Sequence, residues 1–202
     1  DTGVKRFLFS STAAVYGEPE FCPIDEKHKL NPLNPYAQTK IIIEKILQDI
    51  AKADSEWSIV SLRYFNPIGA HKSGLIGDDP LLEGNSNLMP EIIKVVNGSK
   101  NYLKVFGDDY ETSDGTGVRD YIHIVDLSAA HVTALDYVNK NNGINFFNIG
   151  TGKGVSVLEL IKTFEKVSGL SVPIKISNRR KGDCAVCFAN PKKANDILKW
   201  QS

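Results

Sequence analysis

The sequence predicts an α/β fold with a largely parallel sheet, because strand-like apolar runs alternate with helix-like segments through most of its 202 residues. Hydrophobic residues make up 42% and charged residues 24% of the chain, which are ordinary proportions for a globular domain. The formal net charge is zero, so nothing in the composition indicates nucleic acid or an anionic membrane as a partner. No apolar run reaches the roughly 18 residues that a membrane-spanning helix needs.

Two strands and one helix are predicted in the first third of the chain. Residues 4–11 form an apolar run that ends in small polar residues, and residues 57–65 form a second run. Between them, Asn34 is a good helix N-cap and Pro35 suits the first helical position, where its missing N–H costs nothing. The apolar face of this helix is expected from Ile42, Ile43, Ile46, Leu47 and Ile50.

The remaining chain continues the alternation. After a loop rich in Gly, Asn, Asp and Pro at 66–87, the predicted elements are a helix at 87–97, a strand at 102–107, a strand running into a helix at 118–138, a strand at 144–150, a helix at 156–169, a strand at 172–177 and a helix at 191–200. Asp126 is the expected cap of the helix within 118–138. Ser156 and Glu159 form a capping box, and Gly169 ends that helix.

A glycine-rich turn, NIGTGKGVS at 148–156, lies between a predicted strand and a helix. It resembles a phosphate-binding loop, but it has neither the G-x-G-x-x-G spacing nor the P-loop pattern. A turn of this kind needs no ligand to explain its glycines, so a structural role is favoured over phosphate binding.

The three cysteines, Cys22, Cys184 and Cys187, are too few and odd in number for a disulfide framework, and they indicate a reducing compartment. Cys184 and Cys187 form a C-x-x-C pair, but a zinc site needs two further ligands and the four histidines are scattered. No metal site is predicted.

Tyr36 and Lys40 are the first candidates for catalysis. They are four residues apart on the predicted helix and therefore share a face. A nearby ammonium stabilises a phenolate and so makes a tyrosine a better base. Ser10, Ser11 and Thr12 end the first strand, and ligands of open α/β sheets bind outside the carboxyl ends of the strands. A hydroxyl from this group would complete a proton path.

Six stretches make the sequence resemble the UDP-glucose 4-epimerase family of the extended short-chain dehydrogenase/reductase superfamily. They are FSSTAAVYG (9–17), NPYAQTK (34–40), LRYFNPIGAHKSGLIGDDP (62–80), NLMP (87–90), VFGDDYETSDGTGVRDYIHIVDL (105–127) and RRKGD (179–183). The resemblance covers essentially the whole chain. It implies an NAD(P)-binding, Rossmann-like doubly wound sheet, incomplete here, in residues 1–66. A smaller UDP-sugar-binding domain would span 67–202, with 118–150 packing back on the sheet.

The resemblance implies an isomerase of galactose metabolism that interconverts UDP-galactose and UDP-glucose through a 4-keto intermediate, with NAD as the transient hydride acceptor. Tyr36 would be the general base, Lys40 would assist it and hold the nicotinamide ribose, and Thr12 would bond the sugar 4-hydroxyl. The residues expected beside NAD are Tyr36, Lys40, Phe65, Ser10 and Ser11.

On the UDP-sugar side, arginine forks suit a diphosphate and a carboxylate suits ribose hydroxyls. The residues that the resemblance assigns there are Thr12, Asn66, Asn87, Leu88, Lys104, Val105, Phe106, Arg119, Tyr121, Arg180, Asp183 and Cys187. Cys187 matches a position that gates the sugar pocket, and its small side chain implies that N-acetylated UDP-hexosamines also fit. Ser86 departs from the family, which usually has asparagine there.

The family begins with a strand, a G-x-x-G-x-x-G turn and a helix that have no counterpart in this sequence. We therefore expect the chain to lack the N-terminal third of the enzyme, together with the NAD pyrophosphate site, and to be inactive alone. The first strand would then have an unpaired edge. The full-length enzyme is expected to be cytoplasmic and a homodimer.

Two alternatives stay open. The first is another nucleotide-sugar enzyme of the superfamily, a 4,6-dehydratase or a decarboxylase. A dehydratase needs an acid and a base beside the threonine, whereas Ala13 and Ala14 follow Thr12 here and cannot exchange a proton. The second alternative is a non-catalytic UDP-sugar-binding fragment.

Overall fold

The computed structural model describes residues 3–79 and 87–202, so Ser86 lies outside the described residues. The helices are α1 (Pro35–Ala53), α2 (Leu88–Val96), α3 (Ile124–Val138), α4 (Val157–Ser168) and α5 (Lys192–Leu198), with a 3-10 turn η1 (Ala13–Tyr16). The strands are β1 (Arg6–Thr12), β2 (Ser58–Tyr64), β3 (Asn66–Ile68), β4 (Leu103–Phe106), β5 (Val118–Arg119), β6 (Tyr121–His123), β7 (Gly143–Ile149), β8 (Val155–Ser156), β9 (Ile174–Ser177) and β10 (Val186–Cys187). The predicted α/β alternation is confirmed.

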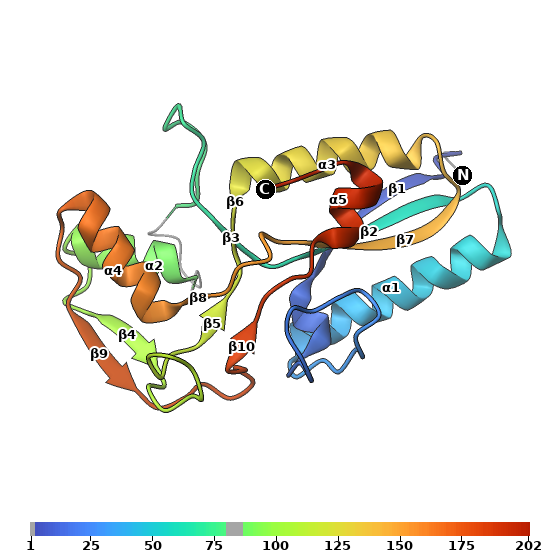
Figure 1. The fold of residues 1–202 in the computed structure, drawn as a ribbon. Helices are drawn as coiled ribbons and strands as arrows, with labels where there is room; N and C mark the ends of the chain where they lie inside the picture. The colour runs from blue at the N-terminus through green and yellow to red at the C-terminus, as the bar shows by residue number, and fades with distance from the viewer. Residues whose placement is uncertain (1–2, 80–86) are drawn as a thin grey trace.

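The larger lobe is built on a parallel three-stranded sheet in the order β1-β2-β7. In its register Thr12 lies opposite Tyr64, and Tyr64 lies opposite Ile149, so the carboxyl ends of all three strands meet at one edge. Helix α1 covers one face of the sheet, and α3 and α5 cover the other (Figure 1).

The main core lies between this sheet and α3 with α5. Its fully buried members include Val60 and Leu62 on β2, Phe147 on β7, and Ala130 on α3. Trp200, which follows α5, is buried in this core, and its indole Nε1 donates to the carbonyl of Asp126 at 2.9 Å. Residues from 118–150 therefore contribute both a strand and a covering helix to this sheet. The domain boundary near residue 66 stays a prediction.

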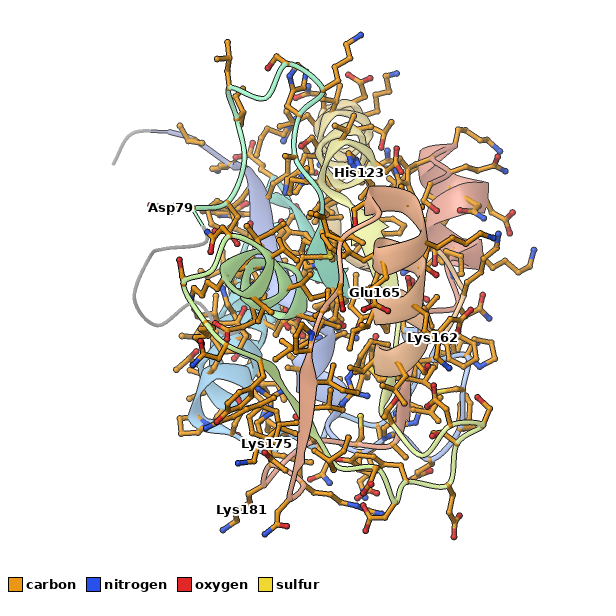
Figure 2. All side chains as sticks on the ribbon, turned by 90° about the vertical axis from the view of Figure 1, so that its left-hand side faces the viewer. Asp79, His123, Lys162, Glu165, Lys175 and Lys181 are labelled. Atoms are coloured by element: carbon orange, nitrogen blue, oxygen red, sulfur yellow. The ribbon has the colours of Figure 1, made fainter. Side chains whose placement is uncertain are left out.

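The smaller lobe pairs β4 with β9 in parallel and packs α2 and α4 against them. Its core consists of Ile92, Val95, Leu103, Val105, Leu160, Ile161 and Val172. Figure 2 looks onto this lobe, with Lys162 and Glu165 on α4 and Lys175 on β9. The short strands β3, β5, β6 and β8 link the two lobes (Figure 1).

The buried face of α1 differs from the predicted one. Ile42, Ile43 and Ile46 are 47%, 36% and 52% exposed, and the predicted apolar face is therefore wrong for these three residues. The residues that α1 buries are Ala37, Ile41, Glu44 and Leu47. The helix is rotated from the expected orientation because the buried carboxylate of Glu44 is paired with groups of the sheet.

Most of the predicted helix ends are confirmed. The Asn34 side chain accepts from the backbone N–H of Ala37 at 2.8 Å, and Ser156 accepts from that of Glu159 at 3.0 Å. Asp126 is not the cap of α3. His123 takes that position, because its Nδ1 accepts from the N–H of Val125 while Asp126 lies within the first turn. Across 3–79 and 87–202, no helix has the length and apolar character needed to cross a membrane.

Candidate functional site

The start of α1 brings Tyr36 and Lys40 to the carboxyl edge of the sheet. Lys40 Nζ donates to the carbonyl oxygen of Ser10 at 2.8 Å, and it lies 5.6 Å from the centre of the Tyr36 ring. The same ammonium lies 5.1 Å from the ring of Phe9. The Tyr36 side chain is 56% exposed. The predicted pair therefore shares an open surface at a strand end, where a ligand could reach both groups.

The three hydroxyls at the end of β1 have different surroundings. Thr12 Oγ1 accepts from the N–H of Ala14 at 3.1 Å and caps η1. Ser10 Oγ is bonded to the Tyr64 hydroxyl at 2.8 Å, next to Lys40. Ser11 points the other way: its Oγ is buried and donates to Glu44 Oε1 at 2.7 Å. The structure thus brings Ser10 to Lys40 and commits the hydroxyl of Ser11 to the interior.

A buried polar network beneath this edge was not predicted from the sequence. Arg63 donates to Glu44 through Nε at 3.0 Å and Nη2 at 2.7 Å, and both side chains are nearly inaccessible. Arg63 Nη1 also donates to the Tyr16 hydroxyl at 2.9 Å, which in turn donates to Asn148 at 2.7 Å. Burial raises the pKa of Tyr16 to about 12, against the lowering effect of Arg63. The network ties α1, two strands and η1 together directly below Tyr36 and Lys40.

The glycine-rich turn does cradle an anion, but that anion is a side chain of the protein. The buried carboxylate of Asp120 accepts from the N–H and Oγ1 of Thr151, at 2.8 and 2.7 Å, and from the N–H of Gly152 at 3.0 Å. The N–H of Ala189 donates to it as well, at 3.1 Å. These donors are already used, so the turn does not supply a phosphate site. This agrees with the structural role that its spacing favours.

A pocket of about 650 Å³ lies in the smaller lobe, against the linking strands, and gathers most of the predicted UDP-sugar residues. Those that line it are Asn66, Asn87, Leu88, Lys104, Val105, Phe106, Arg119, Tyr121, Arg180 and Asp183. They come from β3, α2, β4, β5, β6 and the segment before β10, so only the fold brings them together. The convergence of ten residues from separate motifs on one cavity is what a single ligand site requires.

Two arginines contribute positive charge to the pocket. Arg180 Nε donates to Asp183 Oδ2 at 3.0 Å, and its guanidinium stacks over Phe106 with 4.6 Å to the ring centre. Arg119 Nη1 donates to the carbonyl of Val118 at 2.9 Å. Each guanidinium keeps further N–H donors. A diphosphate would accept from them, and Phe106 would offer an aromatic face to a base.

Sequence reasoning missed several residues of the pocket wall. They include Glu91, Tyr102, Tyr110 and Val157. Partial burial raises the pKa of Glu91, but hydrogen bonds from Lys100 and Lys94 outweigh it and lower the pKa overall. Glu91 is the acidic residue in the first turn of α2, and Tyr102 is the aromatic residue just before β4. These two sequence features could have indicated that the residues belong to the site.

The two remaining predicted site residues are Phe65 and Cys187. Phe65 directly follows β2, is 4% exposed, and packs with Tyr16 and Ile24 in a small core. Cys187 is half-buried and lies opposite Arg119 in the β5–β10 pair. Within the described ranges, no group of His, Cys, Asp or Glu side chains is arranged to hold a metal ion.

Comparison with known proteins decides the family. Residues 1–150 match the model of the NAD dependent epimerase/dehydratase family. The chain belongs to this family. It is 55% identical to UDP-glucose 4-epimerase of Bacillus subtilis over 200 residues, which are 99% of the chain and 59% of that relative. The chain spans about three-fifths of the length of the relatives it matches.

Solved structures of the epimerase/dehydratase family match the fold closely. The structure of UDP-glucose 4-epimerase from Bifidobacterium longum in complex with NAD+ and UDP has a TM-score of 0.93 at 48% identity, covering 98% of this chain and 59% of its own. The UDP-Glc/GlcNAc 4-epimerase from Campylobacter jejuni has a TM-score of 0.79 at 40% identity, covering 99% of this chain and 60% of its own. The predicted Rossmann-like α/β fold is confirmed by these matches.

Proposed function

We propose that the protein to which this chain belongs is a UDP-glucose 4-epimerase, an isomerase that interconverts UDP-galactose and UDP-glucose in galactose metabolism. One observation carries the proposal: a pocket lined by Arg119 and Arg180 lies in the same chain as the exposed Tyr36–Lys40 pair at the sheet edge. The two arginines suit a diphosphate, and the Tyr36–Lys40 pair suits proton transfer to and from a hydroxyl.

In this proposal Tyr36 removes the proton from the sugar 4-hydroxyl, and Thr12 hydrogen-bonds that hydroxyl from the end of β1. The ammonium of Lys40 is fixed by the carbonyl of Ser10 and lies 5.6 Å from the centre of the Tyr36 ring. The 4-keto sugar then turns within the site, and Tyr36 returns the proton when the opposite configuration forms. Proton transfer by a positioned side chain contributes typically 10²–10⁴-fold to a rate.

The residues present fit the nicotinamide end of NAD. Lys40 uses one N–H on Ser10 and keeps two for ribose hydroxyls, while Tyr64 ends the neighbouring strand and Phe65 follows it. NAD supplies reversible hydride acceptance when it is bound. The glycine-rich turn at 148–156 binds Asp120 and so is not proposed to hold the pyrophosphate.

For the nucleotide, Arg119 and Arg180 would hold the diphosphate, and Asp183 would accept from the ribose hydroxyls. The exposed edge of β4, with Phe106 at its end, would receive the uracil. Cys187, small and opposite Arg119, leaves room for an N-acetyl group, so UDP-hexosamines are proposed as additional substrates. The relative named for both glucose and N-acetylglucosamine forms supports this range.

We also propose a homodimer in the cytoplasm for the whole protein. The exposed Ile42, Ile43 and Ile46 form an apolar stripe on α1 that a second subunit could cover. The three free cysteines fit a reducing compartment.

A second candidate function, UDP-sugar binding without catalysis, applies to this chain alone, because its own residues line the pocket while Asp120 engages the glycine-rich turn. Two measurements on the purified chain separate the possibilities: UDP affinity by calorimetry, and NAD released on denaturation. We expect UDP to bind and NAD to be absent. Near-stoichiometric NAD would show that the chain binds the cofactor unaided, and no UDP binding would contradict the proposed function.

A further inference from the structure

The two thiols of the C-x-x-C pair and a third from a distant segment lie close enough to influence one another electrostatically, next to Asp183 of the pocket lining. Cys184 and Cys187 lie at the two ends of the segment containing β10, and Cys22 comes from the loop after η1. Cys22 Sγ lies 3.6 Å from the carbonyl oxygen of Val186. All three thiols are free and half-buried. We call Cys22, Cys184 and Cys187 the thiol cluster.

The members of the cluster have different electrostatic surroundings. A hydrogen bond from the Cys187 thiol lowers the pKa of Cys184 to about 7. Arg119 also lowers this pKa, whereas burial and the charge of Asp183 raise it. The same bond and burial raise the pKa of Cys187, and burial raises that of Cys22. Because Arg119 is the register partner of Cys187, a guanidinium stands next to the C-x-x-C pair. A thiolate is the reactive form of cysteine, and a neighbouring cation favours it.

We propose that Cys184 and Cys187 are a redox-active dithiol, in which Cys184 is the nucleophile toward hydroperoxides and Cys187 is the resolving thiol. The assignment rests on the C-x-x-C spacing, the partial burial of both free thiols and the position of Arg119 opposite Cys187 in the β5–β10 pair. It requires no NAD and no sugar, and so it is independent of the epimerase chemistry.

The reaction consumes one hydroperoxide. The Cys184 thiolate attacks one peroxide oxygen, the O–O bond breaks, and the other oxygen leaves and is protonated to water or an alcohol. Cys184 is then a sulfenic acid. Cys187 attacks the Cys184 sulfur, the S–OH bond breaks, and the departing hydroxide takes the thiol proton of Cys187 as water. The dithiol is oxidised by two electrons to a disulfide, and the peroxide is reduced by two.

The dithiol is coupled to the pocket through two of its lining residues. Arg119 and Asp183 both line the pocket and both act on Cys184. A bound diphosphate would pair with Arg119 and place negative charge near Cys184, which disfavours the thiolate. UDP should therefore slow the reaction of Cys184; this part alone rests on the proposed function.

The test uses the 202-residue chain without cofactor. Each cysteine is labelled with iodoacetamide at a series of pH values from about 5 to 9, and peptide mass spectrometry measures the labelling rate. This pH range spans ordinary and lowered thiol pKa values. At neutral pH, Cys184 should be labelled at least about tenfold faster than Cys22. The matched variant Cys22→Ser should leave that rate unchanged, whereas Arg119→Gln should slow it. Hydrogen peroxide should produce a Cys184–Cys187 disulfide, seen as the loss of two hydrogen masses and reversed by dithiothreitol.

Cys187→Ser should halt oxidation at the sulfenic acid, which dimedone traps on residue 184. Equal labelling of Cys184 and Cys22, or no disulfide and no dimedone adduct after peroxide, overturns the dithiol. Saturating UDP should slow labelling of Cys184 at least about threefold. If UDP binds without slowing it, the coupling through Arg119 is wrong. If UDP does not bind at all, the proposed function fails while the UDP-free measurements still decide the dithiol.

Discussion

Glu44 on α1 and Arg63 on β2 form a buried ion pair with two hydrogen bonds, 2.7 and 3.0 Å long. Glu44 lies one helical turn beyond Lys40, and the pair therefore fixes α1 to the sheet just below the candidate catalytic edge. Ser11 and Ser61 complete the set of groups that donate to the carboxylate, at 2.7 and 2.9 Å. The position of Tyr36 and Lys40 over the strand ends follows from this anchoring.

Removing Glu44 should cost the chain much of its stability. Glu44→Ala leaves the guanidinium of Arg63 buried without its partner, which typically costs about 3–5 kcal/mol. Urea unfolding followed by circular dichroism measures the loss. The control is Asp49→Ala, which removes an exposed ion pair to Lys52 (3.8 Å) on the same helix and should cost less than about 0.5 kcal/mol. Equal effects of the two variants would contradict the anchoring role.

Arg180 should carry a large part of UDP affinity. Arg180→Ala removes a charge-assisted donor from the pocket, worth about 1.5–3 kcal/mol, or roughly 10–100-fold in Kd. Calorimetric titration of UDP into the chain measures the change. Arg179→Ala is the matched control, because Arg179 pairs with Asp109 at 2.7 Å on the surface. A loss of affinity as large in Arg179→Ala would place the nucleotide elsewhere.

Acid should weaken the junction between the segment 108–117, which contains Asp114, and α4. Burial pushes the pKa of Asp114 upward, but hydrogen bonds from Ser156 and Thr116 outweigh it and lower the pKa overall. A carboxyl group whose pKa is lower in the folded state than in the unfolded state stabilises the folded state. This stabilisation is fully present above the unfolded-state pKa, near 4, and is lost as the pH falls through the folded-state pKa.

The free energy of unfolding should therefore drop more steeply from about pH 5 to pH 3 in the wild type than in Asp114→Asn. Urea titrations at several pH values measure the slopes. Asp136→Asn, an exposed change on α3, should keep the wild-type slope. Identical slopes in the wild type and Asp114→Asn would contradict the assignment.

Gly150 should tolerate no side chain. A Cβ there would lie 2.6 Å from Asp120 Oδ2 and 2.8 Å from the Cβ of Ala189, so Gly150→Ala presses on the buried carboxylate that orders the glycine-rich turn. Overpacking of this kind costs about 1–3 kcal/mol. Thermal unfolding should show the loss, whereas the exposed Gly77→Ala should change stability by less than about 0.5 kcal/mol. If Gly150→Ala left the thermal stability unchanged, the turn would be able to accommodate a side chain at this position, contrary to the prediction.

The sequence predicted what local rules control. Asn34 with Pro35, and Ser156 with Gly169, mark helix ends through contacts within a few residues, and the structure has them at those places. The spacing of Tyr36 and Lys40 likewise follows from helix geometry. The two-residue strands β8 and β10 were missed, because pairing partners far along the chain define them.

Long-range partners explain the remaining differences. Nothing near Glu44 in the sequence shows that Arg63 will bury it, and the expected apolar face of α1 was wrong for that reason. The glycine-rich turn gives no sign that Asp120, about 30 residues earlier, supplies its anion. The pocket residues were found from family motifs rather than from periodicity, and only the fold shows that they meet.

Turnover tests the central claim most directly. The chain would replace the matching segment of the Bacillus subtilis relative, with which it shares 55% identity, and conversion of UDP-galactose to UDP-glucose would be followed by chromatography. We predict that the hybrid protein is active, that Tyr36→Phe lowers kcat by about 10²–10⁴-fold with UDP affinity retained, and that Tyr137→Phe has little effect. A folded, UDP-binding hybrid that gives no UDP-glucose, or one in which Tyr36→Phe keeps full activity, would contradict the account.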